Sequence, residues 1–507
     1  MKKIISTIAL FSALCAACSN IPTSLVPDTP SGAPDYFCTW NVQGYAVSYT
    51  GGTNTRAVIN EQYMFGAEKF ENWAELFPEI RADLYFVMDD SWDIPQDVNN
   101  TPNEYLGLTE LDASRFPSFT GTPTQRLKKL TKKVKSLGWK GLGGWICAQE
   151  AEMVHVPANA DSVEAYWTER LQAADEAGFA YWKVDWGHKD RNDEWRKNLT
   201  AWGRTHAPNL VIEHAMKGKY IEFSDVFRTY DVENITATPV TIQRVADLLK
   251  YSAQGDAAGI VNCEDEPYIA AGLGCAIGVM RHPFNGNLPD GRQDHVFPPV
   301  GRDYKSRLDE VIRGVRWHRI AEPFGVADDA HIDTVKLQDY WDIRPNESYV
   351  GHKDGERLHV SAPARVSRNM PLPEIAADST TAVPFIMASR YPNGATAIVT
   401  TERTLGRECV LNPVAVTVKM SDWYKPIGIF GLYESLVLDF DNEIGAQDFT
   451  VLGQDLAGEL AIDITDRVSI QGTRMIVPGE LINEIGLMAA REGDKSTPGM
   501  VLQIFAQ

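Results

Sequence analysis

Short apolar runs alternate with amphipathic stretches between residues 36 and 328. Runs such as ADLYFVMDD, FAYWKVDWG and NLVIEHA have the length and composition of buried strands. Between them, TPTQRLKKLTKKVKSLG and DSVEAYWTERLQAADEAG carry apolar residues at spacings of three and four, which predicts helices. Because strand and helix alternate many times, the pattern predicts a parallel (β/α)8 TIM barrel over residues 36–328.

The pattern changes after residue 328. Segments such as AVPFIMASRY, ATAIVTTER and PVAVTVKM are short and strand-like, and Pro, Gly and Asn are frequent in the turns between them. Such a succession of short strands is typical of two packed sheets. We therefore expect a C-terminal domain over residues 329–507 that is an antiparallel β-sandwich.

The N-terminal residues MKKIISTIALFSALCAACSN combine two lysines, a short apolar run and small residues that end at a cysteine. This order is typical of a signal peptide, and the apolar run is too short to span a membrane comfortably. LCAAC resembles a bacterial lipobox, which predicts a signal peptide over residues 1–18 and lipidation of Cys18. Cleavage to a free secreted protein is the alternative. Residues 19–35 are rich in Pro, Ser and Asp, which predicts a flexible tether.

These features predict a protein anchored by lipid in the envelope of a Gram-negative bacterium, periplasmic or at the outer membrane. The formal net charge of −20 argues against nucleic acid, which needs a basic surface. The cysteines after Cys18 are odd in number and widely spaced, so buried free thiols are expected rather than a disulfide framework. No histidine pair with ligand spacing and no phosphate-binding Gly-rich loop occurs in the sequence, so neither a metal nor a cofactor is expected.

Charged and polar residues stand at the C-terminal ends of the predicted barrel strands. They are Asp89, Asp90, Glu150, Asp185, Glu213, His214, Arg228, Asp231, Glu264 and Asp265. In a (β/α)8 barrel these ends converge on one mouth, where active sites lie, whereas an open sheet would spread them along a line. Many carboxylates and few histidines at such a mouth favour a neutral polyol such as a carbohydrate. Trp92 and Trp145 would either stack on a sugar ring or pack in the core.

Asp185 is the strongest candidate for a nucleophile. Lys183 lies two residues earlier on the same side of the strand, and its ammonium would hold Asp185 ionised. A retaining glycosidase needs such a carboxylate and a second one about 5–5.5 Å away that acts as acid and then as base. The alternative is a structural Lys–Asp ion pair at a strand end, and the two residues alone do not separate these interpretations.

Two further strand ends also allow two interpretations. Asp231, with Arg228 three residues before it, is either a second catalytic carboxylate or a solvated loop residue. The adjacent carboxylates of Asp89 and Asp90 would repel each other unless sugar hydroxyls or a calcium ion bind both.

In their order along the chain, these motifs resemble the α-galactosidase clan of glycoside hydrolases, particularly families 27 and 36. CTWNVQGY is similar to the family's first barrel strand, VMDDSWDIPQD to the Asp-Asp-x-Trp motif of strand two, and LGWKGLGGWICAQE to strand three. WKVDWG resembles the Lys-x-Asp nucleophile motif of strand four, VIEHA strand five, FRTYD the Arg…Asp acid/base strand, and NCEDEPYIAAG strand seven. A C-terminal β-sandwich also belongs to the family's usual architecture.

The resemblance implies a role for each matching residue. It makes Asp185 the nucleophile and Asp231 the acid/base. The implied ligands of the sugar are Asp89 and Asp90 near C4 and C6, Lys183 beside the nucleophile, Glu213 and Asp265. Arg228 would either hold the C2 substituent or position Asp231.

The sequence departs from the family pattern at three places. Two residues separate Arg228 from Asp231, where family 27 commonly has three. His214 stands where a Trp often follows the strand-five Glu, and Trp186-Gly187 replaces Gly-Cys. The last two changes are expected to alter the walls of the sugar pocket.

The sequence thus predicts a retaining, exo-acting glycoside hydrolase that resembles an α-galactosidase. Other substrates in the clan are α-N-acetylgalactosaminides, β-L-arabinopyranosides and isomaltosyl chains, and the same intermediate allows transglycosylation. The alternative is a non-catalytic carbohydrate-binding lipoprotein on a degenerate barrel.

Overall fold

The computed structural model describes most of the chain. The described residues are 22–49, 54–96, 108–150, 160–229, 236–284, 306–327, 329–344, 353, 355–377, 381–444 and 449–506. The predicted signal peptide, Cys18 and Asp231 lie outside these ranges. Within them, no helix combines the length and apolar character needed to cross a membrane.

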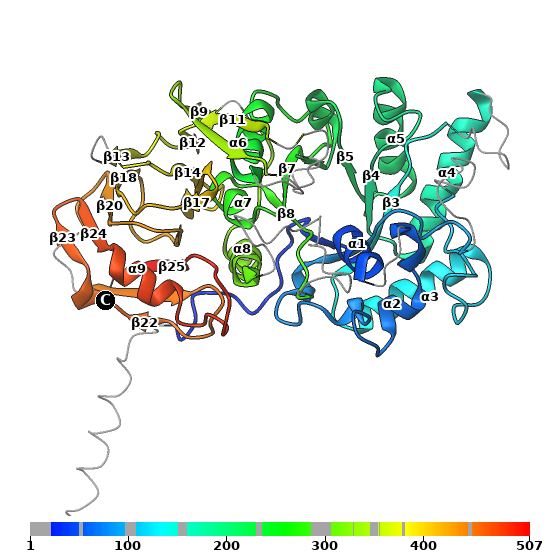
Figure 1. The fold of residues 1–507 in the computed structure, drawn as a ribbon, viewed down its shortest axis with the longest axis horizontal. Helices are drawn as coiled ribbons and strands as arrows, with labels where there is room; N and C mark the ends of the chain where they lie inside the picture. Colours follow the sequence, from blue (N-terminus) through cyan, green and yellow to red (C-terminus); the bar gives the residue numbers. More distant parts are fainter. Residues whose placement is uncertain are drawn as a thin grey trace, which may run out of the picture.

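Eight parallel strands close into a barrel, which occupies the right half of Figure 1. The strands are β1 (Tyr36–Cys38), β2 (Tyr85–Met88), β3 (Gly141–Ile146), β4 (Tyr181–Val184), β5 (Val211–His214), β6 (Val226–Arg228), β7 (Ile260–Glu264) and β8 (Ala276–Val279). Each strand pairs with the next, and β8 closes the barrel on β1, with Gly278 opposite Tyr36. The predicted (β/α)8 barrel is therefore confirmed.

Helices connect the strands and cover the outside of the barrel. They are α1 (Trp40–Tyr49), α2 (Glu61–Phe65), α3 (Pro123–Ser136), α4 (Ala160–Ala177), α5 (Asp193–His206), α6 (Ala237–Leu248), α7 (Pro267–Leu273) and α8 (Leu308–Ile320), with 3-10 helices η1 (Thr55–Val58), η2 (Trp73–Glu75), η3 (Arg81–Asp83) and η4 (Gly218–Phe223). The start of α3 shows how local sequence sets a boundary. Thr122 accepts a hydrogen bond from the Gln125 N–H, the Gln125 side chain accepts one from the Thr122 N–H, and Pro123 occupies the first turn.

Alternation along the strands divides the barrel residues into two sets. Outward-facing Phe86, Trp182 and Ile212 are fully buried beneath the helices. Inside the barrel, a second apolar cluster contains Tyr36, Cys38, Val87, Tyr181 and Met280. Because both faces of the strands are covered, the strands form nearly continuous apolar runs in the sequence. The five cysteines among the described residues are free thiols; four are buried, as expected, whereas Cys409 is partly exposed.

The C-terminal part of the chain forms three sheets in the left half of Figure 1. Its elements are β9 (Ala330–Ile332), β10 (Lys336–Asp342), β11 (Arg357–Pro363), β12 (Arg365–Arg368), β13 (Glu374–Ala376), β14 (Phe385–Arg390), β15 (Thr396–Thr401), β16 (Arg403–Gly406), β17 (Glu408–Val410), β18 (Ala415–Met420), β19 (Ile427–Phe430), β20 (Ser435–Phe440), β21 (Phe449–Asp455), β22 (Ile462–Asp463), η6 (Thr465–Arg467), β23 (Ser469–Gln471), β24 (Arg474–Pro478), α9 (Gly479–Gly486) and β25 (Gly499–Ala506). An eight-stranded sheet has the order β22-β21-β25-β19-β15-β14-β12-β9 and a five-stranded sheet the order β13-β18-β20-β24-β23. These two sheets share one apolar core, as a sandwich requires.

The prediction that this domain is antiparallel is wrong for four pairs of strands. The pairs β10–β16, β12–β14, β15–β19 and β18–β20 are parallel. Between β15 and β19 the chain leaves for the other two sheets, and it then returns in the same direction. The spacing of short apolar segments contains no information about the direction of such a return.

Helices α7 and α8 of the barrel cover the free face of the eight-stranded sheet (Figure 1). Helix α7 approaches the sheet closely at Gly272, where a Cβ atom would lie 2.7 Å from a methyl group of Val399. On α8, buried Arg313 donates to both carboxylate oxygens of Asp455, at 2.9 and 3.0 Å. The sheet is thus buried on both faces: its barrel-facing side shares one apolar cluster with the barrel, and its other side forms the separate core of the sandwich.

Residues 22–35 pack against both parts of the protein, which differs from the predicted flexible tether. The Leu25 N–H donates to the Gln454 side chain at 2.6 Å, and the Ser31 N–H donates to Asp83 of the barrel at 2.8 Å. In Figure 1 this segment is the blue coil that runs from β22 to the barrel. The Pro- and Ser-rich composition predicted flexibility. However, the segment contains the apolar pair Leu25 and Val26, and both side chains are buried.

We expect this packing to contribute to stability. Val26 is 3% exposed, so Val26→Asp would bury an unpaired charge and lower the melting temperature by several degrees. Thr29→Asp places the same charge at an exposed position of the same segment and serves as the matched control. Equal melting temperatures for the two variants in thermal unfolding would show that the segment is a tether after all.

Candidate active site

Six charged side chains form a connected layer at the carboxyl ends of the barrel strands. They are Asp89 after β2, Lys183 on β4, Asp185 after β4, Glu213 on β5, Arg228 on β6 and Glu264 on β7. None of them is more than 9% exposed. Since buried charges are stable only when they are paired, the contacts within this polar layer define the site.

Asp185 is held by donors on both carboxylate oxygens. Arg228 Nη2 lies 2.6 Å from Oδ1, and the indole N–H of Trp145 lies 2.8 Å from Oδ2. Arg196 donates to the backbone carbonyl of Asp185 at 2.5 Å from the outer side of the barrel. The orientation of this carboxylate is therefore set by three neighbours from β3, β6 and α5.

Lys183 pairs with Asp89 instead of Asp185, which corrects the expected pairing. Its ammonium lies 2.7 Å from Asp89 Oδ2, and the Cys38 thiol donates to the same oxygen at 2.9 Å. Burial alone would raise the pKa of Asp89, but Lys183 and the Cys38 hydrogen bond lower it below its usual value. Burial alone would lower the pKa of Lys183, but Asp89 holds it well above its usual value. Both groups are thus charged across the neutral range.

Arg228 lies among three carboxylates. Its guanidinium nitrogens are 2.6 Å from Asp185, 3.6 Å from Glu213 and 3.9 Å from Glu264. Burial alone would lower the pKa of Arg228, but these carboxylates raise it well above its usual value. In the described part of the mouth, four carboxylates of the polar layer therefore share two cations, and negative charge is in excess.

Glu213 takes up part of this excess as a bound proton. It is completely buried and accepts a hydrogen bond from the Tyr181 hydroxyl at 2.7 Å. Burial raises the pKa of Glu213 to about 7, and the opposing effects of Arg228 and the Tyr181 hydrogen bond only partly offset it. Glu213 is therefore protonated in a large fraction of molecules near neutral pH.

The adjacent residues Asp89 and Asp90 use different cations. Asp90 accepts hydrogen bonds from Arg56 at 2.9 Å and from the Ser91 hydroxyl at 2.8 Å. Burial raises the pKa of Asp90 by more than Arg56 lowers it. Asp89 and Asp90 thus each have a cationic partner. Among the described residues, no group of His, Cys, Asp and Glu is arranged to hold a metal ion.

The two tryptophans expected near the sugar lie in different places. Trp145 is beside Asp185, and its ring centroid is 5.6 Å from that of Trp186. Trp92 is fully buried, donates to the Trp145 carbonyl at 2.9 Å and packs on Phe179. Trp92 therefore supports Trp145 from behind, which agrees with the packing interpretation.

Strand β7 presents Glu264 to the polar layer, and Asp265 points elsewhere. Asp265 Oδ1 accepts the backbone N–H groups of Met280 and Arg281 at 3.1 Å each. Its pKa is raised to about 6 by burial, against the effect of Arg281. Glu264 was predicted only as a charged residue at a strand end and was given no role in binding. Strand alternation could have found it, because Glu264 lies two residues after inward-facing Asn262.

His214 faces away from the site. Its ring nitrogens lie 3.1 Å from Arg196 and 2.8 Å from the Thr200 hydroxyl, both on α5. Burial, with a further contribution from Arg196, lowers the pKa of His214 well below its usual value. The expectation that His214 alters the sugar pocket is therefore wrong in its geometry, because His214 follows Glu213 on the opposite face of β5.

Trp186 lies beside Trp145, on a turn that is tightly fixed. The Ala148 N–H donates to the Trp186 carbonyl at 2.9 Å. Gly187 has a φ of +148°, and a Cβ atom there would lie 2.1 Å from the Ala148 carbonyl oxygen. A glycine is thus required after Trp186, and the turn brings the ends of β3 and β4 together. Residues 97–107, 151–159, 230–235 and 285–305, which follow β2, β3, β6 and β8, lie outside the described ranges.

Several solved structures are similar to this chain at low sequence identity. A Geobacillus stearothermophilus β-L-arabinopyranosidase of glycoside hydrolase family 27 is 10% identical, with a TM-score of 0.37, over 93% of this chain and 96% of that one. A Bacteroides fragilis protein provisionally described as an α-galactosidase is 12% identical, with a TM-score of 0.39, over 94% and 79%. An Anoxybacillus α-amylase is 8% identical, with a TM-score of 0.42, over 93% and 98%. No protein-family model and no curated protein matches the sequence. The reaction and the substrate therefore have to be argued from the site itself.

The proton on Glu213 has a consequence for stability. Because its folded-state pKa of about 7 lies above the ordinary value of 4.5, the stability it contributes at low pH is lost as the pH rises through 7. Glu213→Gln removes this dependence, so the melting temperature of the variant minus that of the wild type should increase between pH 5 and pH 8. A constant difference in thermal unfolding at the two pH values would contradict the assignment.

Removing the Arg228 guanidinium, which three carboxylates share, should lower the stability of the fold. Arg228→Met leaves three carboxylates without their common partner, and we expect the free energy of unfolding in urea to fall by about 3–5 kcal/mol. Lys419→Met removes a cation that is half exposed and pairs with Asp439, so it should change stability little. Similar small losses for both variants would mean that Arg228 does not organise the mouth.

Proposed function

We propose that this protein is a retaining glycoside hydrolase with Asp185 as its nucleophile. The observation that carries the proposal is the Asp185 carboxylate at the tip of β4, oriented by Arg228 and Trp145 at the mouth of a (β/α)8 barrel. A fixed carboxylate among further buried acids and cations matches what attack on an anomeric carbon needs.

In the proposed mechanism, an Asp185 oxygen attacks the anomeric carbon while the bond to the leaving oxygen breaks. Asp231 donates a proton to that oxygen, which gives a glycosyl-Asp185 ester and a free alcohol. Asp231 then deprotonates water, which attacks the anomeric carbon and releases Asp185. The role of Asp231 rests on its position in the FRTYD motif.

The polar layer suits a neutral sugar with several hydroxyls. Asp89 and Glu264 offer acceptors, and Lys183 and Arg228 offer donors, all around Asp185. We propose a terminal α-galactosyl residue, or a related sugar of the same clan, as the group transferred. This finer assignment rests on the resemblance of the strand motifs.

The proposed location rests on the N-terminal sequence. Cys18 would be the lipidated residue of an envelope lipoprotein, with the carbohydrate substrate reached from the periplasm or the cell surface. Residues 22–35 are packed on the protein, so the tether between lipid and domain would be shorter than composition predicted.

The decisive test is hydrolysis of nitrophenyl glycosides of α-galactose, α-N-acetylgalactosamine, β-L-arabinopyranose and α-glucose. We expect release from at least one of them, and Asp185→Asn should lower kcat by about 10³-fold or more because the covalent step is lost. A 5-fluoro glycosyl fluoride of the same sugar should add its glycosyl mass to the peptide that contains Asp185.

Asp175→Asn, on the exposed side of α4, is the matched control and should retain wild-type turnover. Near-wild-type turnover by Asp185→Asn would refute the nucleophile. No hydrolysis of any glycoside in the panel would favour the non-catalytic carbohydrate-binding alternative.

A further inference from the structure

Glu213 lies deeper in the barrel than the candidate nucleophile. In the sheet register, Glu213 is level with Lys183 of β4 and Val226 of β6. Asp185 and Arg228 each stand two residues further towards the mouth, a rise of about 6–7 Å along a strand. The Glu213 side chain is 0% exposed, whereas Asp185 is 9% exposed. A sugar that contacts Asp185 from the mouth therefore does not reach Glu213, although the sequence resemblance implied a sugar ligand there.

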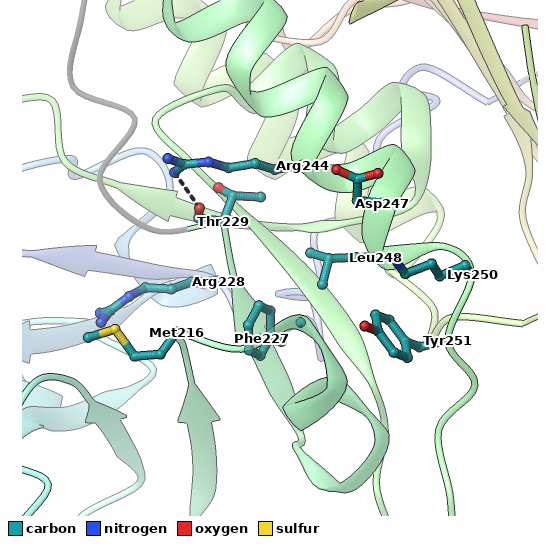
Figure 2. Close-up of a pocket in the computed structure, with 10 residues that line it drawn as sticks. Met216, Phe227, Arg228, Thr229, Arg244, Asp247, Leu248, Lys250 and Tyr251 are labelled. Atoms are coloured by element: carbon teal, nitrogen blue, oxygen red, sulfur yellow. Dashed lines mark hydrogen bonds between the residues drawn. The ribbon is translucent and has the colours of Figure 1, made fainter. Parts of the chain in front are cut away.

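Arg228 joins Glu213 to the candidate nucleophile. The two terminal nitrogens of its guanidinium contact different carboxylates: Nη2 lies 2.6 Å from Asp185 Oδ1, and Nη1 lies 3.6 Å from Glu213 Oε1. Because the guanidinium is planar and rigid, both distances depend on one orientation of the group. Figure 2 shows that Arg228 points away from Phe227 and Tyr251, which line a cavity on the outer side of β6. The guanidinium therefore lies inside the barrel, between the two carboxylates.

A tyrosine fixes Glu213 from below. The Tyr181 hydroxyl donates to Glu213 Oε2 at 2.7 Å, and the Tyr181 ring packs on Tyr36 and Tyr85, with centroid distances of 5.2 and 5.4 Å. The other oxygen, Oε1, has no hydrogen-bond partner among the described residues and faces Arg228. A movement of the guanidinium towards Oε1 would give this oxygen a hydrogen bond, and it would draw Arg228 away from Asp185.

The charge of Glu213 decides how strongly it attracts Arg228. The titratable and charged groups around Glu213 are Tyr36 of β1, Tyr181 and Lys183 of β4, Arg228 of β6 and Glu264 of β7. Because burial raises the pKa of Glu213 to about 7, Glu213 is mostly neutral below this pH and mostly ionised above it. A neutral Glu213 leaves the charge of Arg228 to Asp185, whereas an ionised Glu213 competes for it.

We propose that Glu213 is a positioning residue, which controls the contact between Arg228 and Asp185 through its own protonation, and that it is not a ligand of the sugar. The proposal rests on the proposed function. Loss of the proton draws Arg228 towards Glu213 and weakens the contact that orients Asp185. Since attack on the anomeric carbon depends on this orientation, the glycosylation step slows as the pH rises through 7.

The test measures kcat/KM as a function of pH with the glycosyl fluoride of the sugar that the nitrophenyl panel identifies. Fluoride leaves without a proton from an acid/base residue, so that residue does not affect the result at alkaline pH. Between pH 6 and pH 8.5, kcat/KM of the wild type should fall by about fivefold or more, the usual lower limit of a coupling between two sites. Glu213→Gln carries no titrating group, so the ratio of its kcat/KM to that of the wild type should rise by the same factor.

Tyr181→Phe tests the same proton from the other side of Glu213. The Tyr181 hydrogen bond lowers the pKa of Glu213, so removing it should raise this pKa and move the fall in kcat/KM to higher pH. Glu176→Gln, on the exposed side of α4, is the matched control and should keep the pH dependence of the wild type.

A constant ratio between Glu213→Gln and the wild type over this pH range would overturn the positioning role. So would a raised KM with unchanged kcat in Glu213→Gln, which is the effect of removing a ligand of the sugar. If Glu213→Gln is inactive or unfolds without cooperativity, Tyr181→Phe decides the question, and an unshifted profile overturns the proposal. In each of these cases the wild type remains a hydrolase. A wild type that cleaves neither the nitrophenyl glycosides nor the fluorides would instead overturn the proposed function and this inference with it.

Discussion

Arg228 is the cation on which the arrangement of the barrel mouth depends. It is almost completely buried and lies within 4 Å of carboxylates from the ends of β4, β5 and β7. Taking such charges out of water costs several kcal/mol for each ion unless partners and hydrogen bonds replace the solvent. Closure of the barrel supplies them, because it brings the ends of strands far apart in the sequence to one place. Arg228 can therefore orient Asp185 only in the closed barrel.

In its described part, the mouth has fewer cations than carboxylates, and this shortage determines how its other polar groups are paired. Lys183 is used by Asp89, and Arg56 by Asp90, so neither is left to compensate Glu213. Burial instead raises the pKa of Glu213 to about 7, so that it is protonated in a large fraction of molecules near neutral pH. The result is a buried set of donors and acceptors in fixed positions, which is the property that a site needs if it is to bind a polyol with defined orientation. The eight-stranded sheet and helices α7 and α8 support the barrel from the side opposite α4 and α5, so the mouth rests on a rigid core (Figure 1).

Part of this site could be predicted from the sequence. Lys183, Glu213 and Arg228 face the inside of the barrel at its mouth, because each lies in a strand, where alternate residues share a face. The same rule predicts that Asp265, one residue after inward-facing Glu264, points away from the site, and its side chain does turn towards the β8 backbone. The family motif had assigned the strand-seven role to Asp265, because a motif does not distinguish two neighbouring acids. His214 was misplaced for a related reason, because it follows inward-facing Glu213 and the sequence motif does not say which neighbour enters the barrel. For Trp92, stacking on a sugar and packing in the core were both left open, and the structure shows packing.

The sequence by itself determined the barrel, its strand ends and the candidate nucleophile, because periodicities of two and of three to four residues arise from local backbone geometry. Only the tertiary structure decided which cation pairs with which carboxylate, since those distances depend on how eight strands close around one axis. It also decided that residues 22–35 pack on the protein, and that four strand pairs of the C-terminal domain are parallel. These are contacts between residues far apart along the chain. Their energies depend on burial and on mutual distance, and neither quantity exists before the chain has folded.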